Sequence, residues 1–291
     1  MHVAGGNDIE FLFDWSDHDC IVRYEGDSIM KKMVKSILKR VPGYRYFKKH
    51  RDIQSFKVLS DDEKRYIKFY QQFIKPNDLV FDVGANMGNR TKLFLNLSAR
   101  VVAFEPQKIC SDYLKTVLKR EENFTLIEAA LGDKEGEAEM LISNAHTIST
   151  LSQHWVKATK QSGRFSQYKW NKNQQVHITT LDSVIKKFGV PSFIKIDVEG
   201  YEFEVTSGLT NPIQCISIEF AVENIENTYK CIEHMRSLSN VSFQYSAGES
   251  LDFFLPTWVS EKEIKNILAK ISAQNELAWG DVYIKNIDRD T

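Results

Sequence analysis

The chain contains the stretch LVFDVGANMGN at residues 79–89. Its first part is apolar and its second part is rich in glycine and asparagine, and this change predicts the fold. The first five residues form an apolar run interrupted only by Asp82, which is typical of a strand buried on both faces of a parallel sheet. Gly84 and Gly88 follow and permit the positive φ angles of a sharp turn. The residues from Thr91 to Leu97 then have helical periodicity. A strand, a glycine loop and a helix in this order predict the start of an α/β fold.

The same alternation continues on the C-terminal side of this stretch. Further strands are predicted at residues 101–104, 124–129, 193–196, 215–220, 241–245 and 281–287. Strands that alternate with helices predict right-handed crossovers, and hence a doubly wound sheet of about seven strands with helices on both faces. Between residues 136 and 180 the alternation breaks, because two strand patterns flank a polar, aromatic stretch. We therefore expect a β-rich insertion after the third strand.

The N-terminal part of the chain differs in charge from the rest. Residues 1–29 carry seven acidic side chains against the single Arg23, whereas residues 31–51 carry nine Lys or Arg and no acid. Apolar residues from Met30 to Val41 recur at helical spacing and predict a basic amphipathic helix. Such a helix either packs on its own domain or makes weak peripheral contact with an anionic membrane through residues 30–51.

Length and composition exclude several classes of protein. The chain has 291 residues with 38 basic and 39 acidic side chains, so no global charge attracts a polyanion and no nucleic-acid partner is expected. Its four cysteines show no metal-ligand spacing and are expected to be reduced. Because neither a membrane-spanning apolar run nor a signal peptide is present, a cytoplasmic protein is expected. The predicted organisation is an acidic extension at 1–29, a helical segment at 30–75, and one domain at 76–291 whose insertion covers about 136–180.

Glu105 indicates what the glycine loop binds. It ends the second strand, 21 residues after Gly84, where an acidic side chain can accept hydrogen bonds from ribose hydroxyls. The loop departs from the dinucleotide pattern G-x-G-x-x-G, because Asn86 replaces the middle glycine and Gly88 arrives one residue early. That middle glycine lets backbone approach a pyrophosphate. The departure favours S-adenosylmethionine, with Asn86 and Asp82 suited to its amino and carboxylate groups; alternatively, Asp82 caps the loop or helix.

A second motif, IKIDVEGYE at residues 194–202, puts two carboxylates at the exit of the fourth core strand. Ligands of open α/β sheets bind outside the carboxyl ends of the strands, so Asp197 and Glu199 are expected to face the same crevice as the glycine loop. Closely paired carboxylates can act in proton transfer. Alternatively, Glu199 caps the next helix and pairs with Lys195. A hard cation between Asp197, Glu199 and Glu219 would be held weakly, and no required metal is expected.

The chain resembles the FkbM-type methyltransferases, a branch of the S-adenosylmethionine-dependent superfamily. The matching motifs are VFDVGANMG at 80–88, AFEP at 103–106, AALGD at 129–133, TTLD at 179–182 and IKIDVEGYE at 194–202. The resemblance implies a Rossmann-like class I methyltransferase sheet of seven strands, with S-adenosylmethionine as cofactor. It further implies that Gly84 to Gly88 hold the methionine part, Glu105 the ribose, and the turn from Leu131 to Asp133 the adenine. The family implies methylation of a hydroxyl on a sugar, glycan or natural-product acceptor.

The candidate bases follow from the chemistry of that transfer. A protonated alcohol is a poor nucleophile, so a base within hydrogen-bond reach is needed. Asp197 is the first candidate with Glu199 as its partner, and His146 in the insertion is a second candidate base because the unperturbed pKa of a histidine side chain lies near neutrality. The insertion aromatics, with His154, either recognise the acceptor or cover a small local core; they are Trp155, Tyr168 and Trp170. The alternative functions are a nucleic-acid or other N-methyltransferase and a non-catalytic nucleoside-binding module.

Overall fold

The computed structural model describes residues 10–13, 20–23, 44–250 and 252–288, and the chain divides into two compact units, Met1–Ser55 and Phe56–Thr291. In the first unit, β1 (Glu10–Phe13) pairs antiparallel with β2 (Cys20–Arg23). Helix α2 (Tyr44–Lys57) crosses the boundary between the units. The helix predicted from Met30 to Val41, with its membrane contact, lies outside the described residues. No helix in the described part of the chain is long and apolar enough to cross a membrane.

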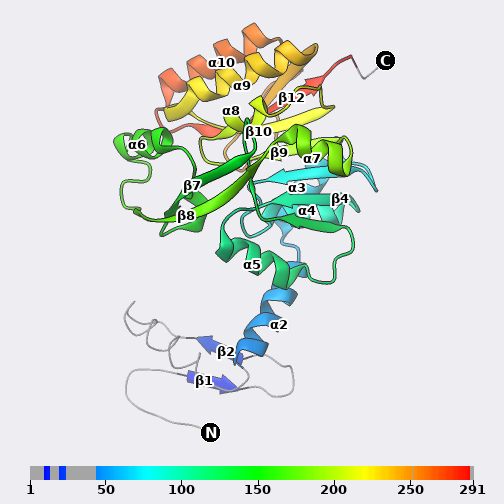
Figure 1. The fold of residues 1–291 in the computed structure, drawn as a ribbon, viewed down its shortest axis with the longest axis vertical. Helices are drawn as coiled ribbons and strands as arrows, with labels where there is room; N and C mark the ends of the chain where they lie inside the picture. The colour runs from blue at the N-terminus through cyan, green and yellow to red at the C-terminus, as the bar shows by residue number, and fades with distance from the viewer. Residues whose placement is uncertain (1–9, 14–19, 24–43, 251, 289–291) are drawn as a thin grey trace. The chain divides into compact units, whose positions relative to one another are not determined.

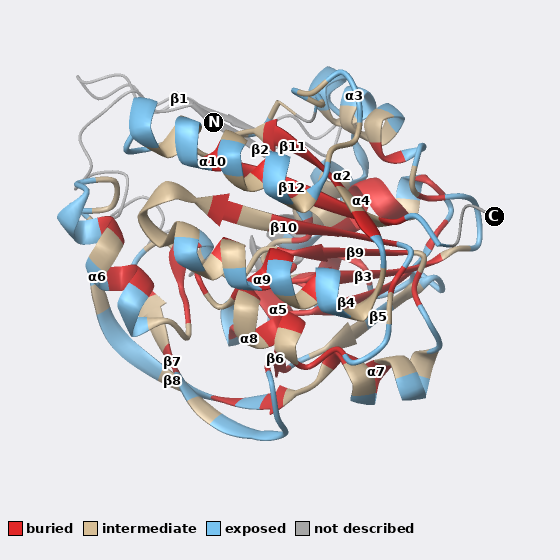
Figure 2. Cartoon of the chain, turned by 90° about the horizontal axis from the view of Figure 1, so that it is seen from above, coloured by how far each residue is buried: buried red, intermediate tan, exposed pale blue. Residues whose placement is uncertain are grey.

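The second unit is built on a seven-stranded sheet, whose order is β11-β12-β10-β9-β3-β4-β5. Its strands are β3 (Leu79–Val83), β4 (Arg100–Phe104), β5 (Phe124–Ile127), β9 (Phe193–Ile196), β10 (Cys215–Ala221), β11 (Val241–Ala247) and β12 (Trp279–Asn286). All neighbours are parallel except β12, which is antiparallel to both β10 and β11. The central strands are almost entirely buried (Figure 2). This order confirms the predicted Rossmann-like sheet.

Helices cover both faces of the sheet because its central strands are apolar on both sides. On one face, Val80 belongs to a core shared with α3 (Asp61–Tyr70) and α4 (Asn89–Asn96). On the other, Phe81 belongs to the core that joins α7 (Leu181–Phe188), α8 (Glu202–Ser207), α9 (Ile225–Leu238) and α10 (Glu261–Gln274). Helix α5 (Lys108–Val117) connects β4 to β5, and α9 and α10 lie side by side (Figure 1).

The β-rich insertion predicted after the third strand is confirmed, and together with β6 it forms a separate three-stranded sheet. Its strands are β6 (Ala130–Leu131), β7 (Gly136–Ser143) and β8 (Trp170–Thr179), in the order β6-β8-β7. Between β7 and β8 lie a short turn, η1 (His146–Ile148), and α6 (Gln153–Gln161). The sequence patterns did not predict α6, which lies within the polar, aromatic stretch of the insertion, or α7, which directly follows the insertion.

Candidate active site

The exits of β3 and β9 meet at Gly84, where the backbone leaves little space for a side chain. Gly84 has a φ of 84°, and a Cβ built on it would lie 1.9 Å from the carbonyl oxygen of Asp197. Only glycine combines this positive φ with so close an approach. The glycine loop and the strand exit that carries Asp197 are therefore in direct contact.

Glu105 braces the glycine loop from the end of β4. One of its carboxylate oxygens accepts a hydrogen bond from the Asn86 backbone N–H at 2.6 Å, and the other accepts from the Gln107 N–H at 2.6 Å. The side chain is only 2% exposed, and burial raises the pKa of Glu105 to about 7. Each oxygen retains a further lone pair, which leaves acceptor capacity for a ribose hydroxyl. Glu105, the residue predicted to bind the ribose, therefore also holds the glycine loop in its conformation.

The side chains of Asp82 and Asn86 are both engaged within the protein. Asp82 is buried and accepts a hydrogen bond from the Thr91 hydroxyl at 2.5 Å, and burial raises its pKa to about 6. This contact ties β3 to the first turn of α4 through two side chains, and it is not a helix cap, because Asp82 accepts from a hydroxyl and not from a backbone N–H. Asn86 Oδ1 lies 2.7 Å from His146 Nδ1, and Asn86 Nδ2 donates to the His146 carbonyl oxygen at 3.1 Å. The insertion is therefore docked on the glycine loop.

A cavity of about 780 Å³ opens along these strand exits, a size that suits a small-molecule ligand. Seven of the predicted site residues line it: Asp82, Gly84, Asn86, Glu105, Leu131, Asp197 and Glu199. Three do not line it, namely Gly88, which packs near Leu114, Asp133, which is exposed, and His146, which contacts Asn86. Asp197 and Glu199 therefore lie at the cavity, whereas the His146 ring contacts Asn86 of the glycine loop and does not line the cavity.

Three carboxylates cluster at the end of the cavity formed by β9 and β10. Oxygens of Asp197, Glu199 and Glu219 all lie within 4.8 Å of one another. Burial, and then the charge of Asp197, raise the pKa of Glu199 and of Glu219 well above the usual range. Such a cluster could bind a cation or share protons.

The buried side chain of Lys195 lies next to that of Asp197. Its Nζ lies 3.4 Å from Asp197 Oδ2 and 2.8 Å from Asp281 Oδ1. Although burial opposes the charge, these two carboxylates raise the pKa of Lys195. The Asp197 side chain itself is 37% exposed, so one side of it faces an ammonium and the other is open to a ligand.

The turn after β9 is capped by Glu202, which differs from the alternative predicted for Glu199. Glu202 Oε1 accepts hydrogen bonds from the backbone N–H groups of Gly200 at 2.9 Å and Val198 at 3.3 Å. Glu199 has a φ of 56°, and its carbonyl oxygen accepts from the Thr150 hydroxyl at 2.7 Å. Lys195 instead forms ion pairs with Asp197 and Asp281. The Glu199 side chain is thereby left facing the cavity.

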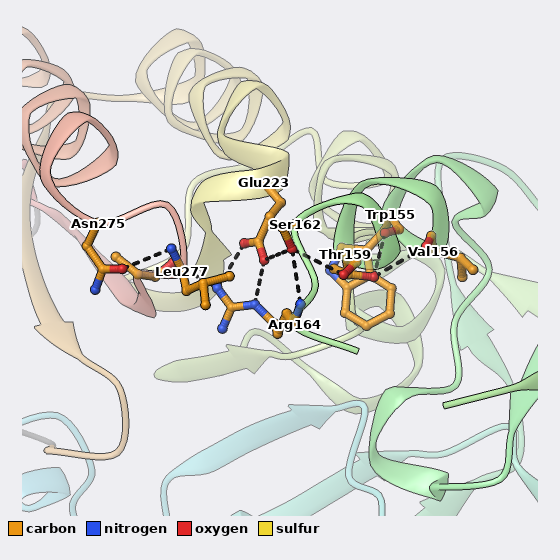
Figure 3. Close-up of polar contacts among 9 residues, drawn as sticks. Trp155, Val156, Thr159, Ser162, Arg164, Glu223, Asn275 and Leu277 are labelled. Carbon is orange, nitrogen blue, oxygen red and sulfur yellow. Dashed lines mark hydrogen bonds and ion pairs between the residues drawn. The ribbon is translucent and has the colours of Figure 1, made fainter. Parts of the chain in front are cut away.

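The insertion forms one wall of the cavity and is tied to the sheet by a buried ion pair. Arg164 donates to both carboxylate oxygens of Glu223, at 2.6 and 2.9 Å, and Ser162 donates to Glu223 at 2.9 Å (Figure 3). Glu223 belongs to η2 (Val222–Asn224), which directly follows β10. Arg164, Trp155, Phe165 and Trp279 all line the cavity. No motif in the sequence indicates this pair, because its members are 59 residues apart.

The insertion aromatics form a small local core, and Trp155 also reaches the cavity. Ile148, Trp155 and Val156 form a small buried core, with Tyr168 and Trp170 packed against it. Trp155 also reaches the cavity, and it packs so closely on the turn after β9 that a Cβ on Gly200 would lie 2.4 Å from its own Cβ. The local core therefore holds one aromatic ring against the turn that carries Glu199.

A Rossmann-like sheet of this strand order, with a glycine loop and facing carboxylates, defines a class I methyltransferase fold. Residues 82–245 match the family model described as the methyltransferase FkbM domain, which covers more than half of the chain. The chain belongs to this family, as its motifs predicted, and contains an S-adenosylmethionine-dependent methyltransferase domain. The residues that match this family model do not include the unit Met1–Ser55.

Two curated relatives and one solved structure show what the chain is similar to. Hexuronic acid methyltransferase AglP of Haloferax volcanii is 26% identical over 171 residues, 56% of this chain and 62% of that protein. The 2-O-methyltransferase NoeI of Sinorhizobium fredii is 24% identical over 153 residues, 49% of this chain and 63% of that protein. The chain thus spans less than two thirds of either relative. The crystal structure of precorrin-6y C5,15-methyltransferase from Geobacter metallireducens has a TM-score of 0.40 and 10% identity, over 79% of this chain and 92% of that one.

Proposed function

We propose that this chain transfers the methyl group of S-adenosylmethionine to a hydroxyl of a sugar or glycan. The observation that carries the proposal is the contact between Gly84 and the Asp197 carbonyl, which joins the cofactor loop to a cluster of carboxylates in one cavity. The two curated relatives, whose names describe sugar-acid and 2-O methylation, support a hydroxyl-bearing acceptor.

The charge of the cavity favours a sulfonium cofactor over a dinucleotide. Two arginines line it, Arg90 and Arg164, and each is paired with a glutamate. Eight carboxylates line it: Asp62, Glu63, Asp82, Glu105, Asp197, Glu199, Glu219 and Glu249. A surplus of acidic groups attracts a cation and repels a pyrophosphate or a nucleic-acid backbone.

In the proposed reaction, Asp197 is the general base. The cofactor supplies an activated methyl group on a sulfonium. The protein aligns the acceptor oxygen with that methyl group and excludes water. Asp197 accepts the hydroxyl proton as the O–C bond forms and the S–C bond breaks, with S-adenosylhomocysteine as the other product. General base catalysis contributes on the order of 10² to 10⁴ fold.

Glu199 and Glu219 have a different part in this proposal. Burial and the charge of Asp197 raise the pKa of both groups well above the usual range, so each retains its proton to a higher pH than an exposed glutamate does. A protonated carboxyl group donates a hydrogen bond and does not repel an ionised neighbour. We assign to them the orientation of further hydroxyls on the acceptor, which suits a polyol. Trp155, Phe165 and Trp279 provide aromatic faces for sugar rings beside them.

Mass spectrometry of candidate acceptors tests the proposal. The protein is incubated with S-adenosylmethionine and oligosaccharides that contain uronic acids or neutral hexoses, with natural-product alcohols, tRNA and DNA in parallel. We expect one added methyl group on a hydroxyl of a saccharide, and a much slower reaction with the Asp197→Asn variant. Methyl transfer to a nucleic acid or to an amine, with none to a hydroxyl, would overturn the proposal.

A further inference from the structure

Arg90 lies at the start of α4, two residues after Gly88. It lines the cavity, and its side chain is only 16% exposed. Its Nη2 donates to Glu249 Oε2 at 2.5 Å, and its guanidinium lies 5.6 Å from the centre of the Tyr66 ring. A nearly buried arginine in an acidic cavity is a strong binding site for a carboxylate.

The cofactor brings a carboxylate that the predicted loop residues do not match. The methionine end of S-adenosylmethionine carries an ammonium and a carboxylate, and the acidic lining suits only the ammonium. Asp82 is itself acidic and is bonded to Thr91, while the amide nitrogen of Asn86 already donates to the His146 carbonyl oxygen. The cofactor carboxylate therefore needs a cation from elsewhere in the cavity.

Only Arg90 and Arg164 supply a positive charge to the described lining, and their surroundings differ. Arg164 binds both carboxylate oxygens of Glu223 and also donates to the Ala278 carbonyl oxygen. Arg90 makes one side-chain hydrogen bond, to a glutamate whose side chain is 57% exposed. A guanidinium has five N–H donors, so Arg90 has donors left for a second carboxylate.

We infer that Arg90 binds the α-carboxylate of the cofactor and that Glu249 forms an ion pair with Arg90 when the cofactor is absent. This inference rests on the proposed function. Glu249 follows β11 and Gly248, which has a φ of 52°. Because the Glu249 side chain is more than half exposed, water solvates it when it leaves the arginine, and the exchange costs little. The ion pair thus marks where the methionine end of the cofactor lies.

Two ligands that differ only in the amino-acid part test this assignment. Calorimetry measures binding of S-adenosylhomocysteine and of 5′-methylthioadenosine, which lacks the amino acid, to the wild type and to Arg90→Met. We expect the variant to bind S-adenosylhomocysteine about 10 to 100 fold more weakly, as for a lost charged hydrogen bond. Its affinity for 5′-methylthioadenosine should stay within about threefold. An equal loss for both ligands, or no loss for either, would refute the assignment.

Three further variants separate the assignment from its alternatives. Arg65→Met is the matched control, because Arg65 contacts the same Tyr66 ring at 5.5 Å but does not line the cavity, and it should leave both affinities unchanged. Arg90→Lys should retain part of the preference for S-adenosylhomocysteine, and it serves if Arg90→Met does not fold. Glu249→Gln should bind S-adenosylhomocysteine more tightly, by about two- to tenfold, because a competing carboxylate is gone. Weaker binding of S-adenosylhomocysteine by Glu249→Gln would show that Glu249 does not compete with the cofactor carboxylate for Arg90.

The outcome also distinguishes this inference from the proposed function. If the wild type binds neither adenosine ligand, the proposed function fails. If the wild type binds S-adenosylhomocysteine but all Arg90 variants bind it equally well, only the role of Arg90 fails. If Arg90→Met binds S-adenosylhomocysteine normally but loses affinity for a uronic-acid acceptor, Arg90 belongs to the acceptor and the inference is wrong.

Discussion

The two ends of the cavity use the same kind of side chain in opposite ways. At the glycine loop, the carboxylates of Asp82 and Glu105 are buried and hydrogen-bonded to Thr91 and to backbone N–H groups, so they hold a fixed shape. At the exits of β9 and β10, Asp197, Glu199 and Glu219 crowd one another within 4.8 Å. The first arrangement stabilises a binding site. In the second, the charge of each carboxylate changes the pKa of the others and so affects which group carries a proton. Changes at the two ends should therefore have separable effects.

The largest effect is expected at the contact that joins the two ends. Gly84→Val should destabilise the fold by roughly 2 to 6 kcal/mol, because a side chain there combines an unfavourable φ with overpacking. It should also abolish S-adenosylhomocysteine binding. Thermal denaturation and calorimetry measure both. Gly136→Ala is the control, since a Cβ at Gly136 meets nothing within 4 Å. Normal cofactor binding by Gly84→Val would show that the contact is not required.

Lys195→Met should affect the acceptor end of the cavity and also destabilise the fold, because buried Asp281 loses its partner ammonium. Without the ammonium 3.4 Å from its carboxylate, Asp197 loses the charged partner that positions it, so methyl transfer should slow. Turnover at neutral pH should fall on the order of 100-fold, with S-adenosylhomocysteine affinity nearly unchanged. Unchanged turnover in the folded variant would show that Lys195 does not support Asp197 in the reaction.

The pH dependence of stability isolates a single buried carboxyl group. Burial raises the pKa of Glu202 from 4.5 to about 7, so between these values the folded state binds more protons than the unfolded state. The free energy of unfolding therefore falls as pH rises through this window. Glu202→Gln keeps an oxygen for the two N–H groups but does not titrate, so the slope should lessen by up to about 1.4 kcal/mol per pH unit. Denaturant titrations measure it, with exposed Glu122→Gln as the control; an identical slope in both variants would contradict this account.

The smallest effect is expected from a chelator. Asp197, Glu199 and Glu219 are close enough to bind a divalent cation. In the proposed reaction, however, Glu199 and Glu219 carry protons and Asp197 is paired with the Lys195 ammonium. Turnover should therefore be unchanged in excess EDTA. Activity that disappears with EDTA and returns with magnesium would assign the cluster to a metal instead.

The sequence predicts the fold and part of the site for a clear physical reason. Buried parallel strands are apolar runs, so the bounds of β3 and β9 could be read directly, and their exits locate Gly84 and Asp197 at one edge of the sheet. The β-rich insertion could be recognised because it breaks the alternation of strands and helices. The pairing of β1 with β2 was not predicted, since four-residue strands in an acidic segment carry too little apolar signal.

The rest of the site depends on contacts between distant residues. Arg90 and Glu249 are 159 positions apart, and Arg164 and Glu223 are 59 apart, so no local pattern connects them. The engagement of Asp82 by Thr91 is equally invisible, because either residue alone is an ordinary part of a strand or a helix. His146 was considered as a base for its residue type, and only the structure shows its ring bonded to Asn86.

Asp197→Asn tests the central claim most directly, namely that one cavity joins a rigid cofactor end to a catalytic carboxylate. Calorimetry with S-adenosylhomocysteine and single-turnover methyl transfer are measured on the same wild-type and variant samples. We predict that the affinity for S-adenosylhomocysteine stays within about threefold and that the rate of transfer falls by about 10² to 10⁴ fold. Undiminished transfer by Asp197→Asn, or the absence of saturable S-adenosylhomocysteine binding by the wild type, would contradict the claim.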